Sequence, residues 1–582
     1  MSRKKKSSRT HGKIPRVKIN IKHELKLHFQ NRSNESFSFS QLVKQLRVRD
    51  GKSKEFVKEL LFKMEAENQL RRGPDGRWIT ALEPTYYKGT VDHVNPKFAY
   101  IMVESLPDDI WVKSKDLNFA MHGDTVTIQI TSKAKASQRP EGRVISIVKR
   151  VKNEFVGRLE VSQKFGFVVL DSRNIFFDVL VYPQKFKKAI HNDKVLVKID
   201  KWPNNENKSP LGSIIYVLGQ AGENNTEIHA IMAEYGLPFE FSKKVETAAA
   251  LIPVAISKEE INERRDFRKE ITFTIDPHDA KDFDDALSVK KLHNGHIEVG
   301  IHIADVSHYV KPDSLLEKEA FERATSVYLV DRTIPMLPEK LSNNLCSLRP
   351  KEEKLTFSAV FEINDQGKVF EKWFGRTVIH SDRRFTYEDA QEIIEGNVGD
   401  YQEEILLLNN LAGRLRDRRF ANGAVNFESV EVNFRLDEKG KALEVIPKER
   451  KEAHKMIEEF MLLANREVAT FIFDKGKGKQ SEGRFPFVYR VHNDPDPEKF
   501  ENFIKFAGGF GYQLSTQGGI SKNLNKLFTD IQGKPEQNVL ESIAIRSLAK
   551  ARYTTDPKGH FGLCFEHYTH FTSPIRRYPD LM

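Results

Sequence analysis

The spacing of apolar residues predicts two short helices near the start of the chain. Val57, Leu60, Leu61 and Met64 recur at the i, i+3, i+4 and i+7 positions, which lie on one face of a helix. The stretch FSFSQLVKQLRV before them has a similar period, and LRRGPDGRWI after them holds a turn dipeptide between two extended pieces. Two helices and a hairpin predict a winged-helix-like module over residues 31–82. Such a module contacts proteins as often as it reads nucleic acid, so its partner stays open.

Alternation of apolar and polar residues replaces the helical period further along the chain. Residues 86–130 and 154–199 repeat one another, and both copies are dense in strand-like segments. Short alternating strands without helices are typical of small closed β-sheets. We therefore expect two tandem OB-fold, cold-shock-like β-barrels, over residues 84–150 and 151–222.

The run KFGFVV in the second copy resembles the RNA-facing strand of cold-shock OB-folds. Because side chains alternate along a strand, Phe165 and Phe167 would lie on one face, with Lys164 near the nucleic-acid backbone. Aromatic rings stack on any base and lysines follow phosphates, which gives a grip with little sequence preference. The alternative is that the phenylalanines fill the barrel core. For Phe167 the two placements are equally supported, although the glycine in this run weakens a buried strand.

The remaining segments complete a multidomain α+β chain. Residues 1–30 are rich in Lys and Arg and poor in apolar residues, which predicts a basic tail that is disordered without a phosphate backbone. Residues 223–260 are mixed and partly helical, as expected of a connector. Residues 261–582 contain both strands and helices, and their number fits one mixed α/β catalytic domain.

Charge narrows the class of partner. The chain carries 93 Lys and Arg against 82 Asp and Glu, a net charge of +11, which favours a polyanion such as nucleic acid. It has no apolar run of about 18 residues, so we expect no membrane partner. The basic N-terminus lacks an apolar segment behind it, so we do not expect secretion. The two cysteines, Cys346 and Cys564, fit a reducing cytoplasm.

One short acidic segment stands out in this basic chain. The sequence TIDPHDAKDFDDA holds five aspartates between two strand-like runs: Asp276, Asp279, Asp282, Asp284 and Asp285. So much like charge repels itself unless a cation lies inside it, and hard oxygen ligands suit Mg²⁺ or Mn²⁺. That chemistry predicts phosphoryl transfer or phosphodiester hydrolysis. An EF-hand does not fit, because Lys281 and Leu287 stand where it needs Gly and Glu. A solvated acidic turn remains the alternative.

Six motifs in a fixed order resemble the ribonuclease II superfamily, whose catalytic domain is named RNB. They are the acidic segment, HIADVSHYV, SVYLVDRTIPMLPEKLSNNLCSL, HKMIEEFMLLAN, YRVHNDPDPEK and HYTHFTSPIRRYPDLM. The plan of helical module, two barrels and RNB domain matches a bacterial branch of that family. The family normally continues past SPIRRYPD into the end of the catalytic domain and another OB-type domain. We therefore expect a C-terminally truncated chain with weaker RNA binding and lower stability than a longer relative.

The resemblance implies a cytoplasmic, Mg²⁺-dependent exoribonuclease, with Mn²⁺ as a substitute ion. It would act processively from the 3′ end by water attack and release nucleoside 5′-monophosphates. Its implied substrates are single-stranded RNA 3′ ends and structured RNA with a 3′ overhang. We also expect the protein to be a monomer and to bind the ribosome or the RNA-degradation machinery.

Residue roles follow from the same resemblance. The metal site corresponds to Asp276, Asp282, Asp284 and Asp285, and the extra Asp279 is left out. The residues expected to act in catalysis are Asp284, Asp285 and Arg576. The residues expected to bind RNA are Tyr328, Phe427 and Glu458, in addition to Lys164, Phe165 and Phe167. Tyr328 and Phe427 would clamp the 3′-terminal nucleotides, and Glu458 would lie near the last one.

Structural roles compete with several of these assignments. Tyr328 sits in an apolar, strand-like context in which aromatic residues usually belong to a core. Arg576 has an equally basic neighbour in Arg577. His302 and His308 are expected to be structural, because Mg²⁺ disfavours imidazole.

Two other functions compete with the enzyme. A non-catalytic protein that binds and remodels RNA would use the same barrels, yet four aspartates without metal would repel its polyanionic ligand. A DNA-binding protein would use the helical module and show affinity for duplexes.

Overall fold

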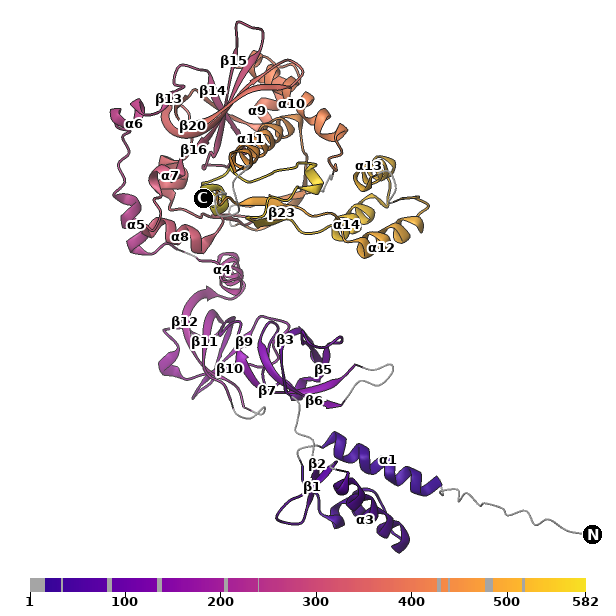
Figure 1. Ribbon diagram of the computed structural model, residues 1–582. Coiled ribbons are helices and arrows are strands. Elements are labelled where there is room, and N and C mark those ends of the chain that lie inside the picture. The colour runs from indigo at the N-terminus through magenta and orange to yellow at the C-terminus, as the bar shows by residue number, and fades with distance from the viewer. Residues whose placement is uncertain are drawn as a thin grey trace, which may run out of the picture. The chain divides into compact units, whose positions relative to one another are not determined.

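The computed structural model describes residues 16–582 except 33–34, 68, 81–85, 133–138, 204–207, 239, 427–430, 438–439, 477–484 and 516–518. The chain divides into two units, Met1–Gly236 and Leu237–Met582. Figure 1 shows three parts in the first unit, which are a helical module and two barrels, and a sheet with helices in the second.

Helices and one hairpin form the N-terminal module. Its elements are α1 (Arg16–Asn31), α2 (Phe39–Gln45), α3 (Gly51–Ala66), β1 (Leu70–Arg72) and β2 (Trp78–Thr80). Side-chain caps begin two of the helices: Ser38 accepts a hydrogen bond from the backbone of Gln41, and Asp50 accepts one from Ser53 at 2.8 Å. The predicted winged-helix-like module is therefore confirmed in its helices and hairpin.

The prediction of a disordered basic tail over residues 1–30 is wrong for its second half. Residues 16–31 form helix α1, in which Leu25 and Phe29 are buried in one core with Trp78. Counting charges missed that Ile21, Leu25 and Phe29 recur every fourth residue, which is the apolar stripe of an amphipathic helix. Residues 1–15 lie outside the described residues.

The two predicted β-barrels are confirmed, and each closes from five strands. The first contains β3 (Tyr86–Val94), β4 (Phe98–Met102), β5 (Ile110–Lys113), β6 (Thr125–Ser132) and β7 (Glu141–Lys149). The second contains β8 (Glu154–Val161), β9 (Gly166–Leu170), β10 (Val179–Val181), β11 (Asp193–Lys201) and β12 (Leu211–Gln220), and α4 (Asn224–Glu234) follows it. Each barrel has its own buried aliphatic core.

A seven-stranded sheet organises the second unit, in the order β13-β20-β19-β16-β15-β14-β21. Its strands are β13 (Arg265–Asp266), β14 (Thr272–Asp276), β15 (Asp285–Lys291), β16 (Ile297–Ala304), β19 (Glu352–Ile363), β20 (Val369–Ser381) and β21 (Arg383–Thr386). One core joins the sheet to α9 (Tyr387–Ile394), α10 (Gln402–Ala421) and α11 (Glu452–Gly476). A second core joins it to α5 (Lys243–Ala250) and α8 (Leu315–Arg323). The sheet is therefore held by apolar packing that involves helices in two separate cores.

Smaller elements surround this sheet. Helices α12 (Pro497–Gly508), α13 (Ile520–Ile531) and α14 (Gln537–Ser547) share a core of their own and lie to one side of the sheet (Figure 1). Three two-stranded sheets pair β17 (Val327–Tyr328) with β18 (Thr333–Ile334), β22 (Glu431–Leu436) with β23 (Ala442–Lys448), and β24 (Tyr489–Val491) with β25 (Arg552–Thr554). The short helices are α6 (Lys258–Asn262), α7 (Val306–Tyr309) and α15 (Tyr578–Leu581).

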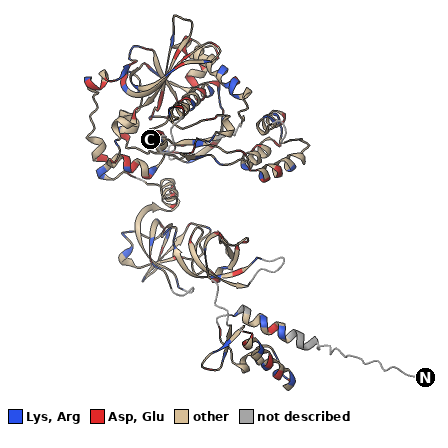
Figure 2. Cartoon of the chain, viewed as in Figure 1, with Lys and Arg blue, Asp and Glu red and all other residues tan. Residues whose placement is uncertain are grey.

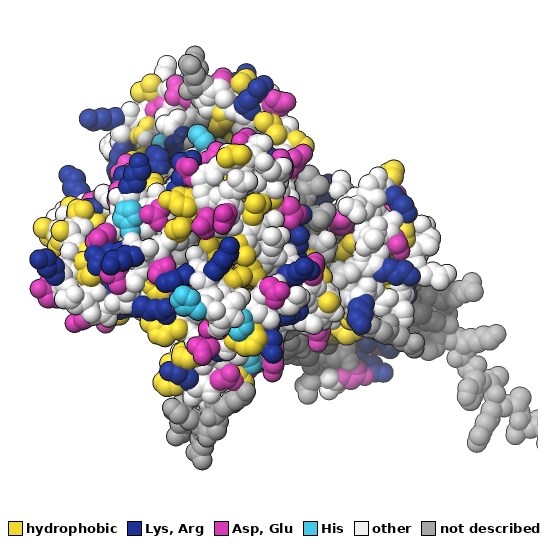
Figure 3. All heavy atoms as spheres, turned by 90° about the horizontal axis from the view of Figure 1, so that it is seen from above, with side chains coloured by type: hydrophobic (Ala, Val, Ile, Leu, Met, Phe, Trp, Pro, Cys, Tyr) yellow, Lys and Arg dark blue, Asp and Glu magenta, His cyan; other side chains and the backbone are white. Residues whose placement is uncertain are grey.

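The net positive charge is spread out in this fold. Acidic and basic residues are interspersed along the elements in Figure 2, and side chains of both signs are interspersed on the face drawn in Figure 3. Within the described part of the chain, none of the helices has an apolar stretch sufficient to cross a bilayer.

Gly157 is a position in the second barrel where a side chain has no room. A Cβ atom there would lie 2.4 Å from the carbonyl oxygen of Val169 on the neighbouring strand. We expect Gly157→Ala to destabilise this barrel by about 1–3 kcal/mol, as overpacking does. Gly51→Ala is the control, because nothing lies within 4 Å of its added Cβ. Hydrogen exchange of residues 154–220 measures the effect, and unchanged protection in Gly157→Ala would contradict the barrel geometry.

His302 should make the stability of the second unit depend on pH. It is fully buried, its ring nitrogens lie 2.7 Å and 2.8 Å from the hydroxyls of Ser358 and Ser288, and burial lowers its pKa to about 3. The folded protein therefore keeps this histidine neutral, while the unfolded chain binds a proton below about pH 6.5. Its contribution is complete above that pH and is lost toward pH 3, by up to about 1.4 kcal/mol per pH unit.

Urea unfolding between pH 4.5 and 7.5 measures this slope. We expect His302→Gln to be less stable but to have a shallower dependence on pH. Equal slopes in the two proteins would show that His302 does not carry the effect.

Candidate active site

The acidic segment joins two neighbouring strands at one end of the sheet. Asp276 is the last residue of β14, and Asp285 is the first residue of β15, which runs antiparallel to it. Asp284 is buried, and its backbone carbonyl accepts a hydrogen bond from the N–H of Ala304 at the end of β16, at 2.9 Å. Asp282 is half-buried, whereas Asp279 is exposed. The geometry thus separates four inward aspartates from one outward aspartate.

Burial makes the charges of these four carboxyl groups costly. Burial, then the neighbouring charge of Asp285, raises the pKa of Asp276 to about 8. Burial raises the pKa of Asp285 to about 6, and it raises the pKa values of Asp282 and Asp284 as well. In Asp276, the Oδ2 atom is buried and has no hydrogen-bond partner. The described residues alone do not balance this negative charge.

Arg576 is a cation that reaches Asp284 in this cluster. Its Nε lies 3.4 Å from Asp284 Oδ2, and the backbone N–H of Ile575 donates to Asp284 Oδ1 at 2.8 Å. A segment far along the chain thus holds Asp284 from two directions. Arg577 instead pairs with Asp580 at 2.8 Å, so geometry separates the two adjacent arginines.

Tyr328 lies at the rim of the cluster rather than in a core. Its side chain is 55% exposed, and its hydroxyl donates a hydrogen bond to Asp282 Oδ2 at 3.3 Å. The hairpin of β17 and β18 presents it there. The ring is therefore free to meet a ligand that approaches the aspartates.

The donor set fits a hard divalent cation in charge and chemistry. Carboxylate oxygens are the ligands that Mg²⁺ prefers, and bound cations favour the ionised form that burial opposes here. Among the described residues, no group of three or more His, Cys, Asp and Glu side chains has the geometry of a ready-made metal centre.

Two of the predicted RNA-binding residues are not joined to the cluster by the described contacts. Phe427 lies outside the described residues. Glu458, on α11, is half-buried and forms an ion pair with Arg450. The roles assigned to both residues stay predictions.

Three further residues near the cluster were missed by sequence reasoning. The ring of Tyr387 stacks on His454, with centroids 4.0 Å apart and an interplanar angle of 10°. Burial raises the pKa of Tyr387, and the charges of Asp285 and Asp276 add to this effect. Arg384 donates to the carbonyl of His278 at 3.0 Å, so it holds the acidic segment from β21. Only the parallel pairing of β21 with β14 brings it there.

The second barrel presents the predicted aromatic pair on its outside. Lys164 is exposed, and Phe165 and Phe167 are half-buried with ring centroids 5.4 Å apart. The glycine between them points inward, because a Cβ at Gly166 would lie 2.9 Å from the ring of Phe186. The core placement that competed for Phe167 is therefore not what the fold adopts.

The first barrel carries a matching aromatic group that the sequence analysis did not single out. Phe98 lies between Tyr100 and Trp111, with centroid distances of 5.3 Å and 5.9 Å. The guanidinium of Arg139 lies over the ring of Tyr100 at 4.7 Å. The repeat between the two barrels was the signal for this surface, since β4 and β9 occupy equivalent positions.

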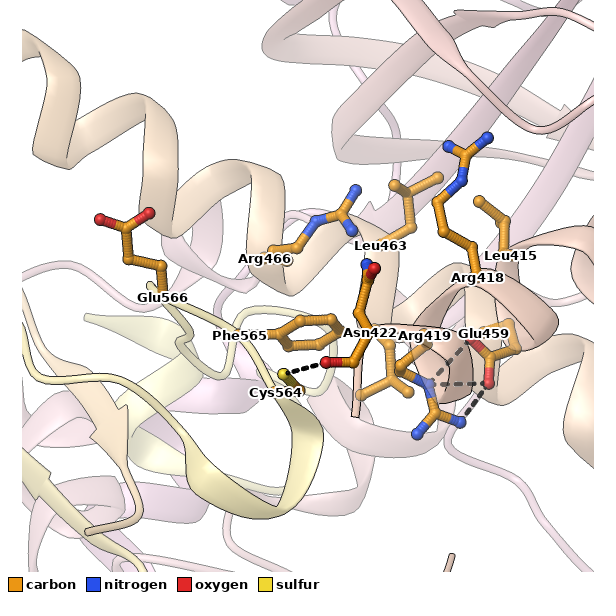
Figure 4. Close-up of a pocket in the computed structure, with 11 residues that line it drawn as sticks. Leu415, Arg418, Arg419, Asn422, Glu459, Leu463, Arg466, Cys564, Phe565 and Glu566 are labelled. Carbon is orange, nitrogen blue, oxygen red and sulfur yellow. Dashed lines mark hydrogen bonds and ion pairs between the residues drawn. The ribbon is translucent and has the colours of Figure 1, made fainter. Parts of the chain in front are cut away.

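A separate cavity of about 140 Å³ lies between α10, α11 and residues 564–566 (Figure 4). Arg418, Arg419 and Arg466 line it, and Arg419 is paired with Glu459. Its described lining contains none of the predicted site residues. It is therefore distinct from the aspartate cluster.

Family comparisons cover most of the chain. Residues 264–582 match the RNB domain, residues 89–147 match the Ribonuclease B OB domain, and residues 167–242 match the cold shock domain. The chain is 37% identical to ribonuclease R of Thermotoga maritima over 93% of its own length and 76% of that protein.

Two solved structures share the fold. Mycoplasma genitalium RNase R in complex with ribose-methylated single-stranded RNA has a TM-score of 0.78 and 27% identity, covering 85% of this chain and 78% of that one. The yeast pseudonuclease Ssd1 has a TM-score of 0.63 and 20% identity, covering 85% and 68%. Because a pseudonuclease shares this fold, the fold alone does not show catalysis, which depends on the residues of the site. The RNB match over more than half of the chain and the identity to ribonuclease R show that this chain belongs to the ribonuclease R family of 3′-to-5′ exoribonuclease hydrolases.

Proposed function

We propose that this chain hydrolyses RNA processively from the 3′ end, with Mg²⁺ held by Asp276, Asp282, Asp284 and Asp285. The observation that carries this proposal is the assembly of buried carboxylates with Arg576 and Tyr328 at one end of the sheet. Mn²⁺ would substitute for Mg²⁺, because both ions accept oxygen ligands. The products would be nucleoside 5′-monophosphates.

Each residue has a distinct part in this proposal. A metal ion held by the four aspartates would supply a water of lowered pKa and positive charge at the phosphate. Arg576, whose guanidinium lies beside Asp284, would neutralise charge that develops on the phosphate. Tyr328 stacks on the 3′-terminal nucleotide together with Phe427, and Glu458 contacts that nucleotide. Asp284 and Asp285, at the start of β15, would position the metal and the scissile phosphate for the reaction.

The barrels would deliver single-stranded RNA to this site. Phe165 and Phe167 stack on bases, and Lys164 follows the phosphates. A relative from Mycoplasma genitalium has been solved with single-stranded RNA, which supports the same ligand here. Structured RNA with a 3′ overhang, a cytoplasmic location, a monomeric state and contacts with the ribosome or degradation machinery belong to the same proposal.

Asp284→Asn should stop hydrolysis while RNA binding persists. The substitution removes a charge held between Arg576 and the backbone of Ile575, so we expect a loss of at least about 100-fold in rate. Mononucleotide release from a 3′-tailed RNA in Mg²⁺ measures this, and fluorescence anisotropy measures binding. EDTA should stop release by the unmutated protein.

Asp279→Asn is the matched control, because this aspartate is exposed and lies in the same segment. We expect it to retain activity close to that of the unmutated chain. Failure of the unmutated chain to release mononucleotides would favour the non-catalytic RNA-binding alternative.

Removal of the barrel aromatics should weaken binding rather than chemistry. We expect Phe165→Ala with Phe167→Ala, in an Asp284→Asn background, to reduce affinity for single-stranded RNA about tenfold or more, since stacking contributes about 1–3 kcal/mol per base. Phe176→Ala is the control, because Phe176 is 52% exposed on the same barrel outside the predicted strand. Equal loss in both proteins would show that the KFGF strand has no special role.

A further inference from the structure

The backbone of the acidic segment is held by contacts from outside its own two strands. The antiparallel pairing of β14 with β15 ends at Phe273 and Leu287, and residues 277–284 belong to neither strand. Like charges on neighbouring aspartates push such a loop apart unless other groups hold it. Arg384 holds the first half of the segment through the carbonyl of His278. The half that leads into β15 needs a support of its own.

The side chain of Ser347 provides this support with two hydrogen bonds, one on each side of Asp282. Its hydroxyl donates to the carbonyl of Lys281 at 2.8 Å and accepts from the N–H of Phe283 at 3.1 Å. One side chain thus spans a residue that carries a predicted metal ligand. Peptide groups are planar, so fixing the groups before and after Asp282 also fixes the direction in which its side chain leaves the backbone.

The hydroxyl of Ser347 lies in otherwise apolar surroundings. The residue is fully buried between Cys346 and Leu348, and both of these neighbours share a buried core with Phe283. A buried hydroxyl destabilises the fold unless it is hydrogen-bonded. Among the described residues, the hydrogen bonds of this hydroxyl are made to the acidic segment. A serine at this core position therefore serves the acidic segment.

Asp284 has supports that do not involve this serine. Its carbonyl accepts from the N–H of Ala304 at 2.9 Å, and its Oδ1 atom accepts from the N–H of Ile575 at 2.8 Å. Asp282 accepts a longer hydrogen bond, of 3.3 Å, from Tyr328, whose side chain is 55% exposed. Loss of the serine hydroxyl would therefore release Asp282 and leave Asp284 in place.

We propose that Ser347 is a positioning residue, which fixes Asp282 in the orientation that binds a divalent cation. This inference rests on the proposed function, in which Asp282 is one of four metal ligands. Ser347 would act through the backbone of residues 281–283 and not by contact with the ion or with RNA. Removal of a group that orients a metal ligand typically lowers the affinity for the ion by about 10–100-fold.

Titration calorimetry of the whole chain with Mn²⁺, in the absence of RNA, tests this proposal without relying on nuclease activity. We expect Ser347→Ala to weaken Mn²⁺ binding about tenfold or more. Ser342→Ala is the matched control, because Ser342 is also a buried serine but its hydroxyl donates to its neighbour Asn343 at 3.0 Å. This control should bind Mn²⁺ as tightly as the unmutated chain.

Two measurements in EDTA separate positioning from folding. Urea unfolding compares the stability of Ser347→Ala with that of Ser342→Ala. Hydrogen exchange should be faster in Ser347→Ala for residues 280–286 and unchanged in the barrels. Ser347→Cys is a second variant of nearly the same size, in which a thiol that bonds only weakly replaces the hydroxyl. It should fold and also bind Mn²⁺ more weakly than the unmutated chain.

A double-mutant cycle tests whether Ser347 acts through Asp282. We expect Asp282→Asn to weaken Mn²⁺ binding, and Ser347→Ala to add little to that loss, because the released backbone no longer carries a charged ligand. In an Asp279→Asn background, the full effect of Ser347→Ala should persist, since Asp279 is exposed and lies outside the ligand set.

Three results would each overturn the proposal. They are unchanged Mn²⁺ binding in Ser347→Ala, an equal loss in Ser342→Ala, and losses that add fully with Asp282→Asn. Failure of the unmutated chain to bind Mn²⁺ would overturn both this inference and the proposed metal site. RNA digestion in Mg²⁺, measured separately, reports on the proposed function. A chain that binds Mn²⁺ with the expected dependence on Ser347 but releases no mononucleotides would contradict that function and support this inference.

Discussion

Four aspartates are held where burial opposes their charge, and the rest of the catalytic unit is arranged around that conflict. Asp276 and Asp285 stand at the facing ends of two antiparallel strands, and Asp284 lies against Arg576. Burial raises the pKa of each of these carboxyl groups, because a low-dielectric environment disfavours the ionised form. A bound divalent cation reverses this preference. The site is therefore built for positive charge that the chain itself supplies only in part.

Such a cluster needs a rigid support, and the seven-stranded sheet provides it. One core fixes the sheet to α9, α10 and α11, and a second fixes it to α5 and α8. Asp276 and Asp285 are the end residues of β14 and β15, so the sheet fixes their backbone positions. Arg384 shows the same principle, because its strand β21 runs parallel to β14 and brings its guanidinium to the acidic segment.

The barrels solve a different problem, which is to present aromatic rings to solvent on a strand that also closes a core. Gly166 makes this feasible, since its missing side chain leaves room for Phe186 inside while Phe165 and Phe167 face outward. A glycine that weakens a strand elsewhere is thus used here for packing. The yeast pseudonuclease Ssd1 shares this fold, so the fold alone does not establish nuclease chemistry.

The sequence by itself determined the local features and the chemical class of this protein. Periodicity predicted the helices of the N-terminal module and the two barrels, because a 3.6-residue or two-residue repeat needs only neighbours along the chain. The acidic segment indicated a metal-dependent phosphodiester chemistry, because five aspartates in ten residues repel one another whatever the fold. The abundance of charged residues wrongly predicted disorder for residues 16–31. These residues form a helix because its apolar stripe packs into a buried core.

Only the tertiary structure determined which residues contact the aspartates. Arg576 and Arg577 are adjacent and chemically alike, yet one reaches Asp284 and the other pairs with Asp580. A core position was the alternative for Tyr328, but its hairpin leaves the side chain 55% exposed beside Asp282. Tyr387 and Arg384 had no local signal at all, because strand pairing across more than 100 residues brings Arg384 to its partner carbonyls. Such contacts depend on strand order and register, which arise from packing between segments far apart in the sequence.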